Sequence, residues 1–505
     1  MTRLAILNSR AQVGVAAPPV TIEVLLSGGL PVFNIVGLPE TAVRESKDRV
    51  RGAIVSSNFE FPDGRITVSL GPADLKKSGG RFDLPIALGV LAASKLIPAE
   101  GLGAYEFVGE LALNGDIRTV PGVLPAALRA AEAGRAIFVP GANGLEATHT
   151  QARVFTAESL LAVTAHLNRA QEIEPLGPRS PQQPADDLPD LCEVRGQAGA
   201  RRALEIAAAG GHNILFIGPP GTGKSMLARR LPGILPPMSE SEALETASVN
   251  SILGRPFDAA DWLKRPFRSP HHTASAVALV GGGSDPRPGE ISRSHNGVLF
   301  LDELPEFSRH VLEVLREPME SGCITVSRAG RQADFPAAFQ LVAAMNPCPC
   351  GYLGDPVNDC RCSADRVGHY RSRISGPLLD RIDIQVQVPR PPRECLRPDA
   401  PEGESSASVR KRVRQASRIQ LRRSGRYNAR LHGKTLEQAC DMNDDAWGLL
   451  EKAGDTYAFS ARVHYRVRRV ARTIADLAGE QRVSATHIAE ALSLRQLDIA
   501  SGPRQ

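Results

Sequence analysis

The eight residues Gly218-Pro219-Pro220-Gly221-Thr222-Gly223-Lys224-Ser225 decide the fold of the central part of this chain. The apolar run 213–217 before them predicts a buried strand, and the run 226–231 after them predicts a helix. Between a strand and a helix, this glycine-rich spacing is typical of a loop whose backbone N–H groups hold phosphates. We expect Lys224 to reach the β- and γ-phosphates of a nucleotide and the Ser225 hydroxyl to help hold Mg²⁺.

A pair of acids belongs to the same predicted site. The apolar run 298–301 leads directly into Asp302 and Glu303. A carboxylate at the end of a buried strand can hold Mg²⁺ through its water ligands, and the second is placed to deprotonate an attacking water. An acidic strand end without chemistry is the alternative, and the phosphate loop upstream disfavours it. ATP and Mg²⁺ are therefore the expected cofactors, and ATP hydrolysis is the expected reaction.

The order of elements predicts a multidomain α/β protein. In the central part, strands that each end in a motif predict a parallel sheet with ligands at its carboxyl edge; the third such run, 339–344, ends at Met345-Asn346-Pro347. The N-terminal part alternates strand-like runs (21–26, 66–70, 136–139) with helix-like ones (84–94, 124–133). Proline-rich segments suggest four parts: 1–170, a linker at 171–191, 192–390, and 391–505.

Composition excludes several classes of protein. Of the 505 residues, 42% are hydrophobic and 23% charged, no apolar run approaches the ~18 residues of a membrane span, and residues 1–10 lack a signal-peptide core. A cytoplasmic protein without a membrane partner is expected. The net charge is +5, but residues 410–505 alone hold 19 Lys and Arg against 10 Asp and Glu. This segment suggests a surface for a polyanion, with a solvated helical face as the alternative.

The motifs together resemble those of an AAA+ ATPase. The phosphate loop, Asp302-Glu303, Asn346 and Leu378-Leu379-Asp380-Arg381 occur in the order of that superfamily. Three further segments extend the likeness: Arg268-Ser269-Pro270-His271-His272-Thr273, Gly289-Glu290-Ile291-Ser292-Arg293, and 371–377. With them the chain resembles the magnesium-chelatase-related branch and, over nearly its whole length, the bacterial YifB/ComM family.

This resemblance implies roles for individual residues and an assembly. Asn346 matches the sensor-1 residue that helps place the attacking water, and Arg381 matches the arginine finger that reaches the nucleotide of a neighbouring subunit. Arg462, in Ser460-Ala461-Arg462, matches the sensor-2 contact to the γ-phosphate from a helical lid. Structural ion pairing is the alternative for either arginine. By the same resemblance, residues 192–390 form the ATPase core, 391–505 form a basic lid, and the chain assembles into a ring, expected to be a hexamer.

The resemblance also implies a function. The YifB/ComM family includes a competence-associated DNA helicase, so we expect an ATP-driven motor that promotes branch migration while transforming DNA is integrated. Its DNA contacts would be independent of sequence and would involve branched or single-stranded DNA. The alternatives are the motor subunit of a metal chelatase, a protein-remodelling ATPase and an ATP-dependent protease.

The N-terminal part resembles the Lon proteolytic domain in residues 108–117, 120–124 and 137–140. In that family a serine and a lysine form the catalytic dyad. Here the lysine position falls on Leu124 and the serine position near Arg81, and leucine cannot activate a nucleophile. A Lon-like fold without peptidase activity is expected. Ser78 paired with Lys76 or Lys77 is the alternative.

Four of the eight cysteines lie close together: Cys348, Cys350, Cys360 and Cys362. Four thiolates can close a tetrahedral zinc site and hold a loop that has little core of its own, here the insert 346–365. The spacing is tighter than that of the familiar C-x-x-C pairs. Structural zinc, free thiols and redox chemistry all remain open.

Arginines recur at every fourth position of one segment: Arg410, Arg414, Arg418, Arg422, Arg426 and Arg430. If the segment is helical, these residues form a slowly winding basic stripe suited to DNA phosphates, and Gly425 is expected to interrupt it. The segments around Arg268 and Arg293 are expected to form loops that face translocating DNA or that are structural. Convergence of the adjacent His271 and His272 on one metal ion is a weaker alternative.

Overall fold

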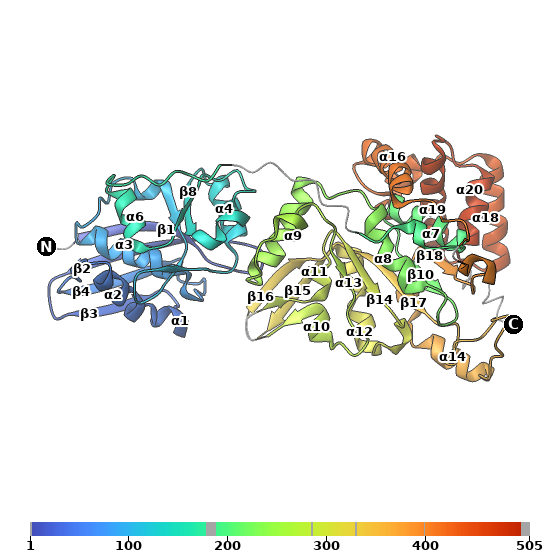
Figure 1. Ribbon diagram of the computed structural model, residues 1–505, viewed down its shortest axis with the longest axis horizontal. Coiled ribbons are helices and arrows are strands. Elements are labelled where there is room, and N and C mark those ends of the chain that lie inside the picture. Colours follow the sequence, from blue (N-terminus) through green and yellow to red (C-terminus); the bar gives the residue numbers. More distant parts are fainter. Residues whose placement is uncertain (1–2, 178–187, 284–285, 329–330, 398, 496–505) are drawn as a thin grey trace.

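The computed structural model describes residues 3–177, 188–283, 286–328, 331–397 and 399–495. Its elements follow one another along an elongated molecule, with the N-terminal sheet at one end and a helical C-terminal region at the other (Figure 1). Of the predicted linker 171–191, residues 178–187 lie outside the described residues.

The N-terminal part is built on a seven-stranded mixed sheet with the order β3-β4-β2-β1-β5-β8-β9. Its strands are β1 (Arg3–Arg10), β2 (Pro19–Ser27), β3 (Val32–Val36), β4 (Arg65–Gly71), β5 (Tyr105–Phe107), β8 (Ala136–Pro140) and β9 (Val154–Ala157), and β6 (Glu110–Leu111) pairs with β7 (Ile117–Arg118). Along β2 the side chains of Val20, Ile22 and Val24 are buried, as the period of two requires for a half-buried strand. The helices are α1 (Thr41–Arg44), α2 (Ser46–Ser56), α3 (Asp83–Ala93), α4 (Val123–Glu132), α5 (Gly144–Ala147) and α6 (Leu160–Leu167). The predicted mixed α/β character of this part is confirmed.

The central part contains a five-stranded sheet in which every pair of neighbours is parallel. The strand order is β11-β14-β17-β10-β18, with β10 (Ile214–Ile217), β11 (Phe267–Arg268), β14 (Val298–Leu301), β17 (Gln340–Met345) and β18 (Ile384–Gln387). Every residue of β10, β14 and β17 is buried, because helices cover both faces of the sheet. The three predicted strands lie within one or two residues of these bounds.

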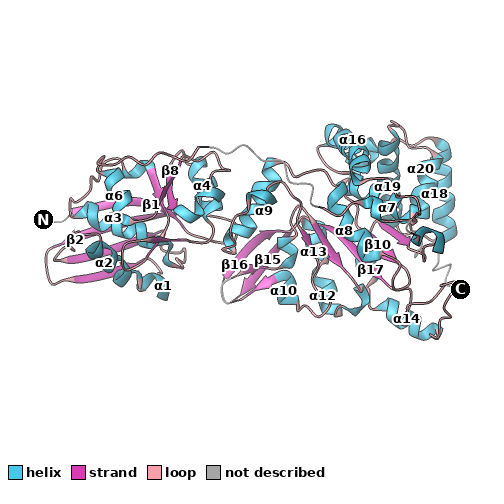
Figure 2. Cartoon of the chain, viewed as in Figure 1, coloured by secondary structure: helices cyan, strands magenta, loops and turns pink. Residues whose placement is uncertain are grey.

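Helices and two hairpins surround this sheet (Figure 2). The helices are α7 (Ala198–Gly210), α8 (Lys224–Ile234), α9 (Glu240–Ile252), α10 (Ala276–Val280), α11 (Glu290–Arg293), α12 (Arg309–Val314), α13 (Arg316–Ser321), α14 (Ala364–Ser372) and α15 (Gly376–Leu379). The hairpins pair β12 (Gly281–Gly282) with β13 (Arg287–Pro288), and β15 (Cys323–Arg328) with β16 (Arg331–Pro336).

The C-terminal region is helical and shares a hydrophobic core with the central sheet. Its helices are α16 (Ser406–Ser424), α17 (Gly433–Ala439), α18 (Asp444–Tyr457), α19 (Ala461–Ala478) and α20 (Ala485–Ser493). Phe216 of β10, Val413 of α16 and Val467 of α19 belong to one buried cluster. Helices α16 and α19 both contact α7, so these helices are held against one side of the central part. Among the residues that the structure describes, no helix combines the length and apolar character needed to cross a membrane.

The N-terminal and central parts meet where α4 approaches α9. The backbone N–H of Gly122 donates to the carbonyl oxygen of Ser251 at 2.9 Å. The N–H of Leu124 donates to Oγ of the same serine at 3.2 Å. Gln12 donates through Nε2 to the carbonyl of Ile252 at 3.3 Å. Directional hydrogen bonds therefore tie the two parts together at the C-terminal end of α9.

Candidate active site

The phosphate loop joins the carboxyl end of β10 to the first turn of α8. Gly221 and Gly223 have positive φ angles of 76° and 91°, which side chains with a Cβ rarely adopt. A Cβ built on either glycine would meet nothing within 4 Å, so space is open beside the loop. Helix α8 starts at Lys224, and its N-terminus favours negative charge at this point. Loop conformation, open space and helix terminus together fit a bound phosphate chain.

Lys224 and Ser225 are both held at this site by hydrogen bonds. The Lys224 ammonium donates to the carbonyl oxygens of Gly218 (2.6 Å) and Pro219 (2.8 Å) and to Oδ1 of Asn346 (3.1 Å). Burial lowers the pKa of this ammonium to about 8, against the opposing negative charges of Asp302 and Glu303. The Ser225 hydroxyl donates to Oδ2 of Asp302 at 2.6 Å.

The predicted site residues at the strand ends come together because β14, β17 and β10 are adjacent and parallel. Asp302 follows β14 and Asn346 follows β17, which brings both to the edge where Gly218 leaves β10. A hydroxyl and a carboxylate in contact are ligands that Mg²⁺ accepts, so Ser225 and Asp302 fit the predicted magnesium site. Glu303 follows with a positive φ of 51°, and its N–H donates to Oδ1 of Asp302 at 2.9 Å.

Glu303 has a partner that sequence reasoning missed. Nδ1 of His272 lies 3.2 Å from Oε2 of Glu303, whose side chain is 53% exposed. His272 follows β11, and β11 pairs with β14, so the contact depends on a strand pairing that cannot be read from spacing. The other histidine of the pair, His271, contacts Thr273 through Nδ1 at 2.8 Å. The two histidines thus make separate contacts.

Arg381 and Arg462 lie at the opposite edge of the sheet from the phosphate loop. The carbonyl of Arg381 accepts a hydrogen bond from Asn213 at 2.9 Å, just before β10 begins, whereas the loop follows the end of β10. The Arg381 guanidinium pairs with Glu320 and donates to the carbonyl of Pro377 at 2.6 Å. Arg462 lies 3.6 Å from the Asp380 carboxylate. The fold therefore does not bring either arginine to the phosphate loop of its own chain.

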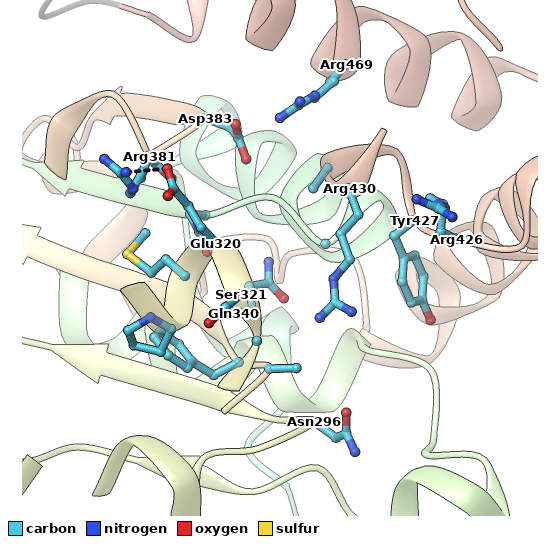
Figure 3. Close-up of a pocket in the computed structure, with 18 of the residues that line it drawn as sticks. Asn296, Glu320, Ser321, Gln340, Arg381, Asp383, Arg426, Tyr427, Arg430 and Arg469 are labelled. Carbon is cyan, nitrogen blue, oxygen red and sulfur yellow. Dashed lines mark hydrogen bonds and ion pairs between the residues drawn. The ribbon is translucent and has the colours of Figure 1, made fainter. Parts of the chain in front are cut away.

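Around Arg381 the chain forms a cavity of about 650 Å³ rich in arginine (Figure 3). The arginines that line it are Arg265, Arg381, Arg426, Arg430, Arg462, Arg466 and Arg469. Its acids are Glu242, Glu320, Asp380 and Asp383. Burial opposes ionisation of Asp383, but Arg466 at 2.6 Å and His212 at 3.3 Å outweigh it and hold its pKa well below the usual range. The cavity therefore carries an excess of positive charge, suited to an anion.

Comparisons with known proteins cover almost the whole chain. The model described as magnesium chelatase, subunit ChlI, matches residues 190–396; subunit ChlI of Mg-chelatase matches residues 22–143; magnesium chelatase, subunit ChlI C-terminal, matches residues 403–495. Competence protein ComM of Haemophilus influenzae is 50% identical over 500 residues, 98% of either chain. The uncharacterized protein YifB of Escherichia coli is 47% identical over 496 residues, which are 98% of this chain and 97% of that protein. The chain belongs to the YifB/ComM family of magnesium-chelatase-like proteins.

A more distant relative indicates the chemistry of the central part of this chain. The magnesium-chelatase 38 kDa subunit of Cereibacter sphaeroides is 28% identical over 223 residues, which are 40% of this chain and 58% of that protein. Membership of this AAA+-like group indicates ATPase activity and the use of nucleotide and Mg²⁺. The contacts of Lys224, Ser225 and Asp302 are consistent with that chemistry.

In this member of the YifB/ComM family, the four clustered cysteines converge. Their Sγ atoms all lie within 4.8 Å of one another. Cys348 is buried and the other three are partly buried. The group can therefore hold a metal ion beside the nucleotide site.

The predicted arginine stripe divides at Gly425, where α16 ends. Arg410, Arg414, Arg418 and Arg422 line one shallow surface of α16, whereas Arg426 and Arg430 line the cavity around Arg381. Arg410 donates to the carbonyl of Gly233 at 2.6 Å. On α16, Arg414, Arg418 and Arg422 are exposed, and so is Lys411. No ion pair among the described residues involves Lys411, Arg414, Arg418 or Arg422.

Two arginines expected in DNA-facing loops are engaged elsewhere. Arg268 donates to both oxygens of Glu290, at 2.7 and 3.0 Å, and Arg293 also pairs with Glu290. Both guanidinium groups therefore have a carboxylate partner, which favours the structural alternative for these two side chains.

Arg81, near the position that the Lon resemblance assigns to the serine, and Leu124, at the position that it assigns to the lysine, are both buried. Arg81 donates to the carbonyl of Pro121 at 2.6 Å, and burial lowers its pKa to about 10. The buried Lys77 ammonium bonds to the carbonyl of Pro72, so it is directed to a backbone oxygen.

Proposed function

We propose that the chain is an ATP-driven DNA motor that works as a homo-oligomeric ring, a hexamer, with each ATP shared between two subunits. One observation carries the proposal: the phosphate-binding groups and the arginines that would complete the site lie at opposite edges of the same sheet. Copies stacked side by side would bring the arginine-rich cavity of one chain against the phosphate loop of the next.

Within a shared site each residue has a defined task. Lys224 and the loop N–H groups hold the phosphates, Ser225 and Asp302 hold Mg²⁺, and Glu303 removes the proton from the attacking water. Mg²⁺, when bound, neutralises charge on the β- and γ-phosphate oxygens.

The remaining polar groups place the water and stabilise charge. Asn346, 3.1 Å from the Lys224 ammonium, orients the water. Arg381 and Arg462 of the neighbouring copy stabilise the charge that develops during transfer. Because both arginines must arrive from another chain, hydrolysis depends on assembly.

DNA is the proposed substrate of the motor. The exposed face of α16 supplies Lys411, Arg414, Arg418 and Arg422, which have no carboxylate partner among the described residues, an arrangement suited to phosphate contacts that are independent of sequence. A relative that is 50% identical bears the name competence protein ComM. We therefore propose branched or single-stranded DNA as the substrate and branch migration in homologous recombination, during natural transformation, as the process.

The other two regions have proposed roles as well. The C-terminal helices act as the lid of the ATPase, since they share its hydrophobic core. The N-terminal part is a Lon-like domain without peptidase activity, because the dyad positions hold Arg81 and Leu124. Unfolded casein should remain uncleaved by this protein. Cleavage that Ser78→Ala abolishes would refute that assignment.

The test of the DNA proposal measures the ATPase rate with and without forked, four-way and single-stranded DNA at two salt concentrations. DNA should stimulate the rate, and Lys224→Ala should abolish it. Replacing Arg414 and Arg418 by alanine should weaken DNA binding and reduce the slope of log affinity against log salt by about two. Lys452→Ala, an exposed charge on α18, is the matched control and should bind DNA normally. Absence of stimulation by every DNA would refute the DNA proposal.

A metal-chelatase motor is the second candidate, because the family models that match are those of magnesium chelatase. It would use the same hydrolytic site but would be stimulated by a partner subunit rather than by DNA. A protein-remodelling ATPase would respond to a protein substrate. DNA-independent hydrolysis that still requires Lys224 would favour one of these two candidates.

A further inference from the structure

The loop between β17 and α14, residues 346–363, contains no helix or strand and has little core of its own. Its larger aliphatic side chains, Leu353 and Val357, are 39% and 65% exposed. A loop of this length without secondary structure is uncommon in a compact domain and needs another means of support. Apolar burial therefore does not explain how this loop is held in place.

The four cysteine thiols have the geometry of a single-ion site. Sγ of Cys348 lies 3.3 Å from Sγ of Cys350 and 3.6 Å from Sγ of Cys360, and the last two are also 3.6 Å apart. Four sulfurs bound tetrahedrally to one zinc at ~2.3 Å lie ~3.8 Å apart. The thiols are thus close to ligand spacing and well beyond the ~2.05 Å of a disulfide. The N–H of Cys362 also donates to Sγ of Cys360 at 3.5 Å.

This loop touches the phosphate loop directly. A Cβ at Gly351 would lie 2.8 Å from Cδ of Pro220 and 3.8 Å from Cγ of Asn346, so the backbone at Gly351 sits against both residues. Asp355, further along the loop, pairs with Arg390 at 3.0 Å. Displacement of the loop would therefore remove a wall from the nucleotide site.

We propose that Cys348, Cys350, Cys360 and Cys362 bind one structural Zn²⁺, and that the zinc-held loop keeps Pro220 and Asn346 in position for nucleotide binding. Thiolates select zinc over the hard Mg²⁺ of the neighbouring site. The zinc site stands independently of the proposed DNA function. The second part of the proposal, that the zinc-held loop keeps Pro220 in position, depends only on nucleotide binding at the phosphate loop.

The first experiment measures metal content in the full chain purified without chelator. We expect about one zinc per chain, retained in Cys323→Ser and lost in Cys360→Ser. Cys323, on β15, lies outside the cluster and is the matched control. Less than about 0.2 zinc per chain, or iron with acid-labile sulfide in its place, would overturn the zinc assignment.

The second experiment measures the affinity for a fluorescent ATP analogue. Loss of zinc should weaken binding about ten-fold, comparable to the effect of losing a supporting shell around a metal or binding site. If Cys360→Ser does not fold, zinc is released from the native protein with a thiol reagent, and zinc release and nucleotide affinity are followed in one sample. Unchanged affinity after complete loss of zinc would overturn the coupling. Because no DNA is present, the result is separate from any failure of the DNA proposal.

Discussion

Arg381→Ala and Lys224→Ala should each abolish ATP hydrolysis alone and restore it when mixed. Arg381 is fixed at the amino end of β10 by its bond to Asn213, and the phosphate loop begins at Gly218. At ~3.3 Å per residue, this stretch separates the two by ~16 Å, beyond the reach of an arginine side chain. Under the proposed function Arg381 acts on the nucleotide of another chain, so we expect a variant lacking it to complement one lacking Lys224.

The expected size of the effect follows from this division of the site. An arginine supplied in trans contributes a factor of ~10³–10⁵ to phosphoryl transfer, so each variant alone should fall at least ~10³-fold. In a ring assembled at random from equal amounts, about one interface in four pairs an intact Lys224 with an intact Arg381. If the sites act independently, the mixture should recover about a quarter of the native rate, several hundred-fold above either variant.

The assay follows phosphate release after the two variants have been dissociated together and reassembled, with mass photometry to verify the assembly. The control replaces the Lys224→Ala partner by the double variant lacking both Lys224 and Arg381, which offers no intact interface to the mixture. If co-assembled variants stay at the level of either one alone, the trans role of Arg381 is wrong. Substantial activity of Arg381→Ala by itself would refute it equally.

Three further predictions concern single side chains. His272→Ala should raise the ATPase rate without DNA about five-fold, because ~1 kcal/mol of hydrogen bonding no longer restrains Glu303. An unchanged rate without DNA would show that the 3.2 Å contact with His272 does not restrain Glu303. Nucleotide affinity should fall about ten-fold from pH 7 to pH 9, because burial lowers the pKa of Lys224 to about 8 and the bound phosphates need a charged ammonium. Lys224→Ala should bind nucleotide weakly, with an affinity that does not change over this pH range. An equal pH dependence in the two proteins would refute the role of the Lys224 ammonium. Asp383→Asn should destabilise the contact between α19 and the segment just before β18 by ~3–5 kcal/mol, because Arg466 loses its buried partner, and hydrogen exchange of α19 should accelerate. Because the pKa of Asp383 is depressed in the folded protein, its contribution to the free energy of unfolding is complete above the ordinary pKa of ~3.9 and declines as the pH falls below that value. Native-like protection from hydrogen exchange in Asp383→Asn would contradict the predicted loss of stability.

The nucleotide half of the site could be predicted from sequence because its geometry is local. Gly218 to Ser225 is one continuous loop, and Asp302 follows its own strand directly. The parallel arrangement then brings these strand ends to one edge of the sheet. The repetition of strand and motif indicated the parallel sheet, whereas the adjacency of β17 and β10, which places Asn346 beside Lys224, comes from the structure.

What the sequence could not show depends on long-range pairing. His272 meets Glu303 only because β11 lies next to β14. Arg268 and Arg293 share the carboxylate of Glu290, a contact that a count of charges does not reveal. The division of the arginine stripe follows from the chain leaving the helix at Gly425, after which Arg430 enters a different environment.

The separation of the two half-sites has a consequence for control of hydrolysis. In a single chain the Arg381 guanidinium is engaged by Glu320, and Arg462 lies beside Asp380, so neither arginine is presented to a phosphate without competition. In the proposed shared site, a neighbour's nucleotide, with its greater negative charge, would displace these carboxylates before the arginines act. Assembly without nucleotide should therefore be weaker than assembly with ATP. Under the proposed function we therefore expect an isolated chain to hold ATP without consuming it, and hydrolysis to begin only when the arginine-rich cavity of a neighbour closes on an occupied phosphate loop.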